Sequence, residues 1–162
     1  MYSFEEVTHE HLPRLAEILN HYILHSTVTF HTQPLTVAEM AEKVFFSQPY
    51  YRAFTIMYAK DVIGYCAVSQ WKKQEAYRHT AEINVYLHHR CIGQGIGTMA
   101  IQHLEAFASD NDIHNLIAGL CSENTPSRRL FEKNGYAHCA HFQKIGQKFG
   151  RQLDVVYMQK FL

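Results

Sequence analysis

Apolar residues in several segments recur every three or four positions, which is the spacing of one face of an α-helix. Four segments show this pattern: 12–23, 36–46, 96–109 and 124–135. Thr8 precedes the first segment and is of a residue type that caps helices. The sequence TVAE at 36–39 has the threonine and glutamate of a capping box. Asn124 and Gly135 bracket the last segment as a candidate cap and a candidate stop.

Other segments are rich in β-branched and aromatic residues or alternate between apolar and polar positions, as strands do. They are 2–7, 53–59, 62–71, 80–87, 114–121, 136–143 and 151–161. Residues 80–87 alternate cleanly, with Ala81 and Ile83 on one face and Glu82 and Asn84 on the other. The order of elements predicts an α+β fold with a mixed, mainly antiparallel sheet, formed by a single domain over residues 1–162.

Composition narrows the class of protein. The chain of 162 residues is 47% apolar and 19% charged, which is typical of a globular domain. Fifteen basic residues balance fifteen acidic ones, so we expect no nucleic-acid partner. No run approaches the roughly 20 apolar residues of a membrane span. The four cysteines form no C-x-x-C pair, and we expect reduced thiols in a cytoplasmic protein.

The stretch GQGIGT at 93–98 follows a predicted strand and opens a predicted helix. It lacks the Lys-Ser or Lys-Thr that completes a Walker loop. A dinucleotide fingerprint needs a sixth-position glycine, and Thr98 occupies that position. Two interpretations stay open. The bare backbone and the helix N-terminus hold a pyrophosphate, or the glycines only form a turn that needs positive φ.

At this point the chain resembles the GCN5-related N-acetyltransferase (GNAT) superfamily, whose acyl-CoA motif has the form Q/R-x-x-G-x-G/A after a central strand. It is similar in particular to the phosphinothricin and methionine sulfoximine N-acetyltransferase group. Three segments show the likeness: LNHYILHSTVTFHTQPLT at 19–36, YRHTAEINVYL at 77–87 and GQKFGRQLDVVYMQ at 146–159. The resemblance runs from about residue 4 to the end, and implies the GNAT acyl-CoA N-acyltransferase fold.

The resemblance implies acetyl transfer from acetyl-CoA to the α-amino group of a small amino-acid-like acceptor. Glu82, on the polar face of its strand, is the candidate general base, directly or through a water. The residues expected to bind the coenzyme are Val85, Tyr86 and Leu87 through their main chain, Gly93, Gln94, Gly95, Ile96, Gly97 and Thr98 at the pyrophosphate, and Asn124 and Ser127 at the pantetheine arm.

The acceptor pocket is expected from segments that match the same group. Its candidate residues are Phe30, Glu75, Ala76, Tyr77, Arg78, Thr80 and Lys148. A cation such as Arg78 or Lys148 can clamp a carboxylate, although a solvated surface charge is the commoner role. The resemblance also implies a homodimer whose interface lies near the site.

Two departures from the family pattern matter. Ile92 stands where the motif has Gln or Arg, and Phe131 stands where relatives have a Tyr or His able to protonate the leaving thiolate. Two alternatives to acetyl transfer to a small amino-acid-like acceptor therefore stay open. One is an acetyltransferase for another amino acid, a polyamine or a protein N-terminus, and the other is a CoA-binding module with impaired catalysis.

The twelve histidines raise the question of a metal ion. His88, His89, His138 and His141 have neither the helical H-x-x-x-H spacing nor a carboxylate at ligand spacing. We therefore expect no metal site.

Overall fold

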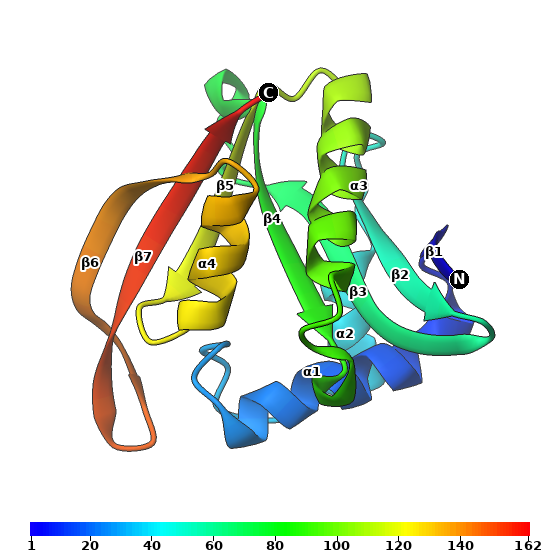
Figure 1. Cartoon of the computed structure of the whole chain (residues 1–162), viewed down its shortest axis with the longest axis horizontal. Coiled ribbons are helices and arrows are strands. Elements are labelled where there is room, and N and C mark those ends of the chain that lie inside the picture. Colours follow the sequence, from blue (N-terminus) through cyan, green and yellow to red (C-terminus); the bar gives the residue numbers. More distant parts are fainter.

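The computed structural model describes residues 1–162 and contains one seven-stranded sheet with helices on both faces (Figure 1). The strands are β1 (Tyr2–Glu6), β2 (Arg52–Tyr58), β3 (Asp61–Gln70), β4 (Thr80–Leu87), β5 (Asn115–Cys121), β6 (Ala137–Lys148) and β7 (Arg151–Phe161). The helices are α1 (Leu12–His25), α2 (Val37–Val44), α3 (Ile96–Asp110) and α4 (Thr125–Lys133). None of them is long and apolar enough to cross a membrane.

The strands are ordered β1-β2-β3-β4-β5-β7-β6 across the sheet. Only the central pair, β4 with β5, is parallel, and every other pair is antiparallel. This confirms the mixed, mainly antiparallel sheet that the sequence predicts.

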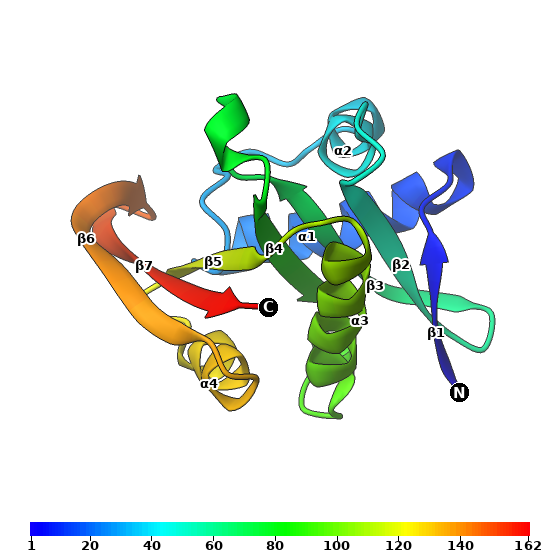
Figure 2. The same ribbon diagram turned by 90° about the horizontal axis from the view of Figure 1, so that it is seen from above.

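The helices form two layers. Figure 2 shows α1 and α2 on one face of the sheet and α3 and α4 on the other. Ala81 and Ile83 of β4 belong to the larger core cluster, together with α3 and Phe131 of α4. Tyr65 and Ala67 of β3 belong to the smaller cluster under α1 and α2. Because successive side chains of a strand alternate, Glu82 faces the α1 and α2 layer.

The helix signals in the sequence are largely confirmed. The Thr36 side chain accepts a hydrogen bond from the amide of Glu39 at 3.1 Å, and Asn124 caps α4 by accepting from the amide of Ser127 at 3.3 Å. The cap predicted at Thr8 is displaced. Thr8 precedes a short 3₁₀ turn, and the α-helix begins at Leu12, where Pro13 occupies the first turn without losing a helical hydrogen bond.

The last hairpin is longer than the sequence predicts. We expected its first strand to end at 143, but β6 continues to Lys148. The register with β7 shifts between Phe142 and Gly146, and Lys144 has a positive φ of 52°. An irregularity of this kind breaks the period-two pattern that marks a strand in the sequence.

Candidate active site

The central strands β4 and β5 pair over three positions only, Thr80 with Asn115, Ala81 with Leu116, and Glu82 with Ile117. Beyond Glu82 the two strands diverge (Figure 1). Each therefore has a stretch of main-chain edge without a neighbouring strand. Backbone N–H and C=O groups on such an edge can pair with an extended ligand, as they do when a peptide adds to a sheet.

The direction of the backbone N–H and C=O groups shows which residues of β4 can bind a ligand at that edge. The amide of His88 donates to Ile63 at the start of β3, and alternate residues of a strand face the same neighbour. Tyr86 therefore directs its main-chain groups toward β3, whereas Val85 and Leu87 direct theirs toward the divergence. The Leu87 carbonyl already accepts a hydrogen bond from the Tyr22 hydroxyl. The main-chain contacts expected of residues 85–87 thus fall to Val85 and to the amide of Leu87.

The glycine-rich turn lies where β4 leads into α3. Gly93 and Gly95 have positive φ of 80° and 81°, and Gly95 is the N-cap of α3. None of the amides from Gly93 to Thr98 donates a hydrogen bond within the chain. These amides, together with the positive end of the helix dipole, form an anion site of the kind that holds phosphate. Gln94 is exposed at the tip of the turn.

The third glycine has a different role. Gly97 is buried, and a Cβ added there would lie 2.7 Å from Cδ2 of Leu130. Gly97 therefore permits close packing of α3 against α4, and Ile96 beside it is buried in the core. Of the three glycines, only Gly93 and Gly95 need the conformation that glycine alone adopts without strain.

Glu82 is half-buried on the face under α1 and α2. Burial raises the pKa of its carboxyl above the usual value, and the charges of Lys43 and Lys72 partly oppose this rise. Burial raises the pKa of the Tyr157 hydroxyl, and the negative charge of Glu82 raises it further. A carboxylate with a raised pKa is better matched to accepting a proton near neutral pH than an exposed one.

Tyr157 of β7 lies on the same side of the sheet as Glu82. Its ring packs over Gly119 of β5, where an added Cβ would be 2.9 Å from the ring. Trp71 packs edge-on against it at 5.4 Å between centroids. Sequence reasoning missed Lys43, Lys72 and Tyr157. Tyr157 lies in the matched segment 146–159, but no local pattern shows that any of the three approaches Glu82.

The segment after α1 is joined to the β6–β7 hairpin. The Lys148 side chain donates to the carbonyl of Thr29 at 2.8 Å and is 4% exposed. The Phe30 ring covers Gly146, where an added Cβ would be 2.4 Å from the ring. The structure thus brings together Phe30 and Lys148, two residues predicted for the acceptor pocket. Burial lowers the pKa of the Lys148 ammonium, which donates its hydrogen bond to the Thr29 carbonyl.

The remaining acceptor candidates lie elsewhere. Glu75, Ala76 and Tyr77 form an exposed 3₁₀ turn before β4. Arg78 stacks on the Tyr50 ring at 3.5 Å from the centroid and donates to the carbonyl of Asn111 at 3.1 Å. The Thr80 hydroxyl accepts a hydrogen bond from the Asn115 side chain at 3.3 Å. In this arrangement Arg78 and Thr80 hold the start of β4, and the Arg78 guanidinium already has the Tyr50 ring and the Asn111 carbonyl as partners.

A hollow of about 430 Å³ lies beside the start of α4. It is lined by His25, Ser26, Thr27, Val28, Glu123, Asn124, Pro126, Phe149 and Arg151. Arg151 makes two hydrogen bonds to the Glu123 carboxylate, at 2.9 and 3.1 Å, and Thr27 donates to the same group at 2.9 Å. The predicted coenzyme residue Asn124 lines this hollow, and Ser127 follows one turn later in α4.

Phe131 lies in the core and is 3% exposed, with its ring centroid 5.1 Å from that of Tyr136. Its ring has no proton to donate, so any proton for a leaving thiolate must come from elsewhere. Ile92, the other departure from the motif, is exposed on the turn.

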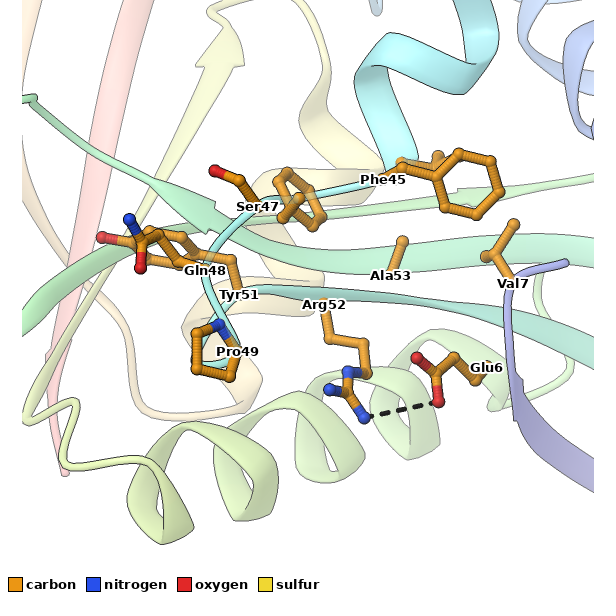
Figure 3. Close-up of a pocket in the computed structure, with 11 residues that line it drawn as sticks. Glu6, Val7, Phe45, Ser47, Gln48, Pro49, Tyr51, Arg52 and Ala53 are labelled. Atoms are coloured by element: carbon orange, nitrogen blue, oxygen red, sulfur yellow. Dashed lines mark hydrogen bonds and ion pairs between the residues drawn. The ribbon is translucent and has the colours of Figure 1, made fainter.

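A second hollow, of about 210 Å³, lies away from these residues, beside β1 and β2 (Figure 3). It is lined by Glu6, Val7, Val44, Phe45, Phe46, Ser47, Gln48, Pro49, Tyr51, Arg52 and Ala53. Arg52 and Glu6 form an ion pair of 3.4 Å at its rim. None of the predicted site residues lines it, so the divergence of β4 and β5 is the better candidate for the site.

Known proteins are similar to this chain in sequence and in fold. Residues 6–157 match the family model described as the acetyltransferase (GNAT) domain. The chain is 30% identical to the phosphinothricin N-acetyltransferase of Streptomyces coelicolor, over 93% of this chain and 91% of that one. It is 28% identical to the L-methionine sulfoximine/L-methionine sulfone acetyltransferase of Salmonella typhimurium, over 90% and 85%.

Solved structures show the same likeness. A GNAT superfamily phosphinothricin acetyltransferase from Sinorhizobium meliloti, crystallised with AcCoA, superposes with a TM-score of 0.92 at 26% identity. The match covers 99% of this chain and 88% of that one. The diverging central strands, the glycine-rich helix start and the family match over most of the chain lead to one assignment. The protein is a member of the GNAT acetyltransferase family.

Proposed function

We propose that the protein transfers an acetyl group from acetyl-CoA to the α-amino group of a small amino-acid-like acceptor of the methionine sulfoximine or phosphinothricin type. Relatives that acetylate phosphinothricin and methionine sulfoximine support the acceptor class, and the related structure with bound AcCoA supports the donor. The observation that contributes most from the chain itself is the position of Glu82, a half-buried carboxylate at the point where β4 and β5 separate.

Acetyl-CoA supplies an activated thioester, and the residues of this chain bind and orient it. The free amides of residues 93–98 hold its pyrophosphate. The main chain of Val85 and the amide of Leu87 hold the extended pantetheine arm. Asn124, in the adjoining hollow, adds a polar contact. This scheme uses no metal ion, because amide hydrogen bonds and the positive end of the helix dipole stabilise the phosphate charge.

Glu82 prepares the acceptor. An amino acid enters with an ammonium group, which must lose a proton before its nitrogen can attack. Glu82 takes that proton, directly or through a water. The nitrogen then forms a bond to the thioester carbon, and the carbon–sulfur bond breaks. The nitrogen releases its second proton to solvent as the amide forms, and the thiolate takes up a proton from solvent, since Phe131 cannot provide one. The products are an N-acetyl amino acid and CoA thiol.

The test is release of CoA thiol from acetyl-CoA in the presence of methionine sulfoximine, phosphinothricin, the common amino acids, spermidine and a peptide. We expect saturable release with one or a few small amino acids and none above background with spermidine or the peptide. Release with spermidine or the peptide alone would overturn the acceptor class while leaving acetyl transfer intact.

A second candidate function is supported by the burial of Phe131 at the position of the expected proton donor. In that case the protein binds CoA without catalysing acetyl transfer. Measurable acetyl-CoA binding by calorimetry, with no thiol release across the whole panel, would favour this function over acetyl transfer.

We also propose that the protein acts as a homodimer in the cytoplasm. Phe142, Ile145 and Phe149 are large apolar side chains exposed on and beside β6, as in surfaces that a partner covers. The four cysteines are unpaired, as in a reducing compartment. Light scattering after gel filtration measures the subunit count, and a monomer at micromolar concentration would refute the dimer.

A further inference from the structure

Three side chains with metal-ligating atoms lie together at the end of the sheet opposite the glycine-rich turn. His79 immediately precedes β4, whereas Asp112 and His114 lie in the loop between α3 and β5. One ligating atom from each lies within 4.8 Å of the others. We propose that His79, Asp112 and His114 form a binding site for a divalent transition-metal ion. This replaces the expectation that the chain has no metal site.

The distances fit a shared ion. Asp112 places one carboxylate oxygen 2.9 Å from Nε2 of His114 and the other 3.4 Å from Nδ1 of His79. Ligands at about 2.0–2.2 Å from a metal, in tetrahedral or octahedral positions, are about 3.0–3.5 Å from one another. Each imidazole therefore lies at nearly a coordination separation from one of the two carboxylate oxygens. The rings of His79 and His114 are nearly parallel, with centroids 5.3 Å apart, so both side chains would rotate to direct their nitrogens at one ion.

The backbone holds the two segments in place. The His79 carbonyl accepts hydrogen bonds from the amides of His114 at 2.9 Å and Asn115 at 3.2 Å. The His114 carbonyl accepts from the amide of Leu162 at 2.8 Å. Asp112 has a positive φ of 60°, a conformation that aspartate tolerates better than most residues. The three ligands are thus presented by a fixed junction between the start of β4, the start of β5 and the chain end.

Binding also requires a change of tautomer at His79. Nδ1 of His79 also lies 2.7 Å from the main-chain carbonyl of Asp112, an acceptor for its proton. Coordination through Nδ1 moves that proton to Nε2, where solvent accepts its hydrogen bond. The ring is exposed, so the change of tautomer leaves no buried group unpaired.

The donor set selects the class of ion. Two imidazoles and one carboxylate suit Zn²⁺, Ni²⁺, Cu²⁺ or Fe²⁺, whereas Mg²⁺ and Ca²⁺ prefer oxygen ligands. All three side chains are exposed, so the ion has open access and water completes its coordination. His79 precedes Glu82 by three residues, about 10 Å of strand at 3.3 Å per residue, which is too far for Glu82 to coordinate the same ion. The ion would therefore link chain segments and make no direct contact with the proposed base.

The test is calorimetric titration of chelator-treated full-length protein with ZnCl₂ near neutral pH. We expect one ion per chain. Asp112→Asn and His114→Ala each remove a direct ligand, so each should weaken binding by at least the roughly 10–100-fold that loss of a mere outer-shell partner costs. His141→Ala is the matched control, because His141 is exposed and lies 2.8 Å from Asp154 but has no third ligand.

A second measurement separates binding from folding. In chelator the variants should melt like the wild type, since the ligands are exposed. Added Zn²⁺ should raise the melting temperature of the wild type and of His141→Ala but not of Asp112→Asn or His114→Ala. Absence of Zn²⁺, Ni²⁺ and Cu²⁺ binding by the wild type, or binding that survives in a His79→Ala/His114→Ala double variant, would overturn the proposal. Acetyl-CoA affinity should be the same with and without the ion.

Discussion

Glu82 is subject to two opposing influences. Burial raises the pKa of its carboxyl, and the positive charges of Lys43 and Lys72 lower it. The rise prevails. The Glu82 carboxyl therefore gains proton affinity from the tertiary fold rather than from its neighbours in sequence, and Lys43 of α2 and Lys72 of the loop after β3 limit that gain.

Glu82→Gln keeps the size of the side chain and removes its ability to accept a proton. We expect turnover to fall by about 10²–10⁴-fold, the usual contribution of a general base. Acetyl-CoA affinity, measured by calorimetry, should be nearly unchanged. Glu5→Gln, on the exposed β1, is the control. Turnover within a few-fold of the wild type would remove Glu82 from the mechanism.

Lys43→Met removes one of the charges that oppose the raised pKa of Glu82. The pKa of Glu82 should rise further, so the acidic limb of the pH profile of kcat/KM should move to higher pH. Lys73→Met, which lies next to Lys72, is the control and should leave the profile in place. An unmoved acidic limb in the Lys43 variant would mean that another group controls it.

The same pKa has a consequence for stability. The folded-state pKa of Glu82 lies above its ordinary value of 4.5, so the folded state binds more protons than the unfolded state once pH exceeds that value. Wild-type stability should therefore decline as pH rises through this window. Glu82→Gln should match the wild type below about pH 4 and be more stable at pH 7. Urea denaturation at both pH values measures this, and a less stable variant at pH 7 would contradict it.

At the scale of elements, the turn between β4 and α3 divides its glycines between two tasks. Gly93 and Gly95 shape an anion site through positive φ, and nothing lies within 4 Å of a Cβ added at either. Gly97 instead gives α3 and α4 room to approach each other. The backbone conformation and the helix packing are thus separable by mutation.

Gly95→Ala places a side chain at φ 81° and costs roughly 1–2 kcal/mol unless the turn relaxes. Relaxation redirects the free amides, so we expect weaker acetyl-CoA binding. Gly97→Ala meets Leu130 and should lower the free energy of unfolding by about 1–3 kcal/mol. Calorimetry and urea denaturation on both variants distinguish the two. Unaltered coenzyme binding by Gly95→Ala would leave the turn with a structural role alone.

At the scale of the whole molecule, the segment after α1 is held against the β6–β7 hairpin. The buried Lys148 donates to Thr29, and Phe30 covers Gly146. Glu123 joins the same region through Thr27 and Arg151. These contacts join the segment that follows α1 to the last hairpin, across more than 100 residues of sequence.

Lys148→Met leaves the Thr29 carbonyl without its donor, and we expect the free energy of unfolding to fall by about 1–3 kcal/mol. Lys144→Met, on the exposed part of β6, should have little effect. If Lys148 is structural, KM should change by the same factor for acceptors with and without a second acidic group. A larger change for the acidic acceptor would restore Lys148 as a carboxylate clamp.

Local chemistry allowed much of the fold to be predicted from the sequence. Alternation defined β4 over 80–87, and the caps at Thr36 and Asn124 lie where their side chains predict. The predicted boundaries were wrong where another local conformation replaced the expected helix cap or strand end. The cap at Thr8 was displaced by a 3₁₀ turn, and β6 continued through an irregularity at Lys144.

The sequence by itself determined the elements, the glycine-rich helix start and the likeness to a family, because these depend on residues close together in the chain. Only the tertiary structure decided the surroundings of Glu82, the separate role of Gly97 and the structural bonds of Arg78 and Lys148. It also placed His79 beside Asp112 and His114. These contacts depend on the order of the strands and on the position at which β4 and β5 diverge. No local sequence pattern indicates which distant side chains the fold brings close together.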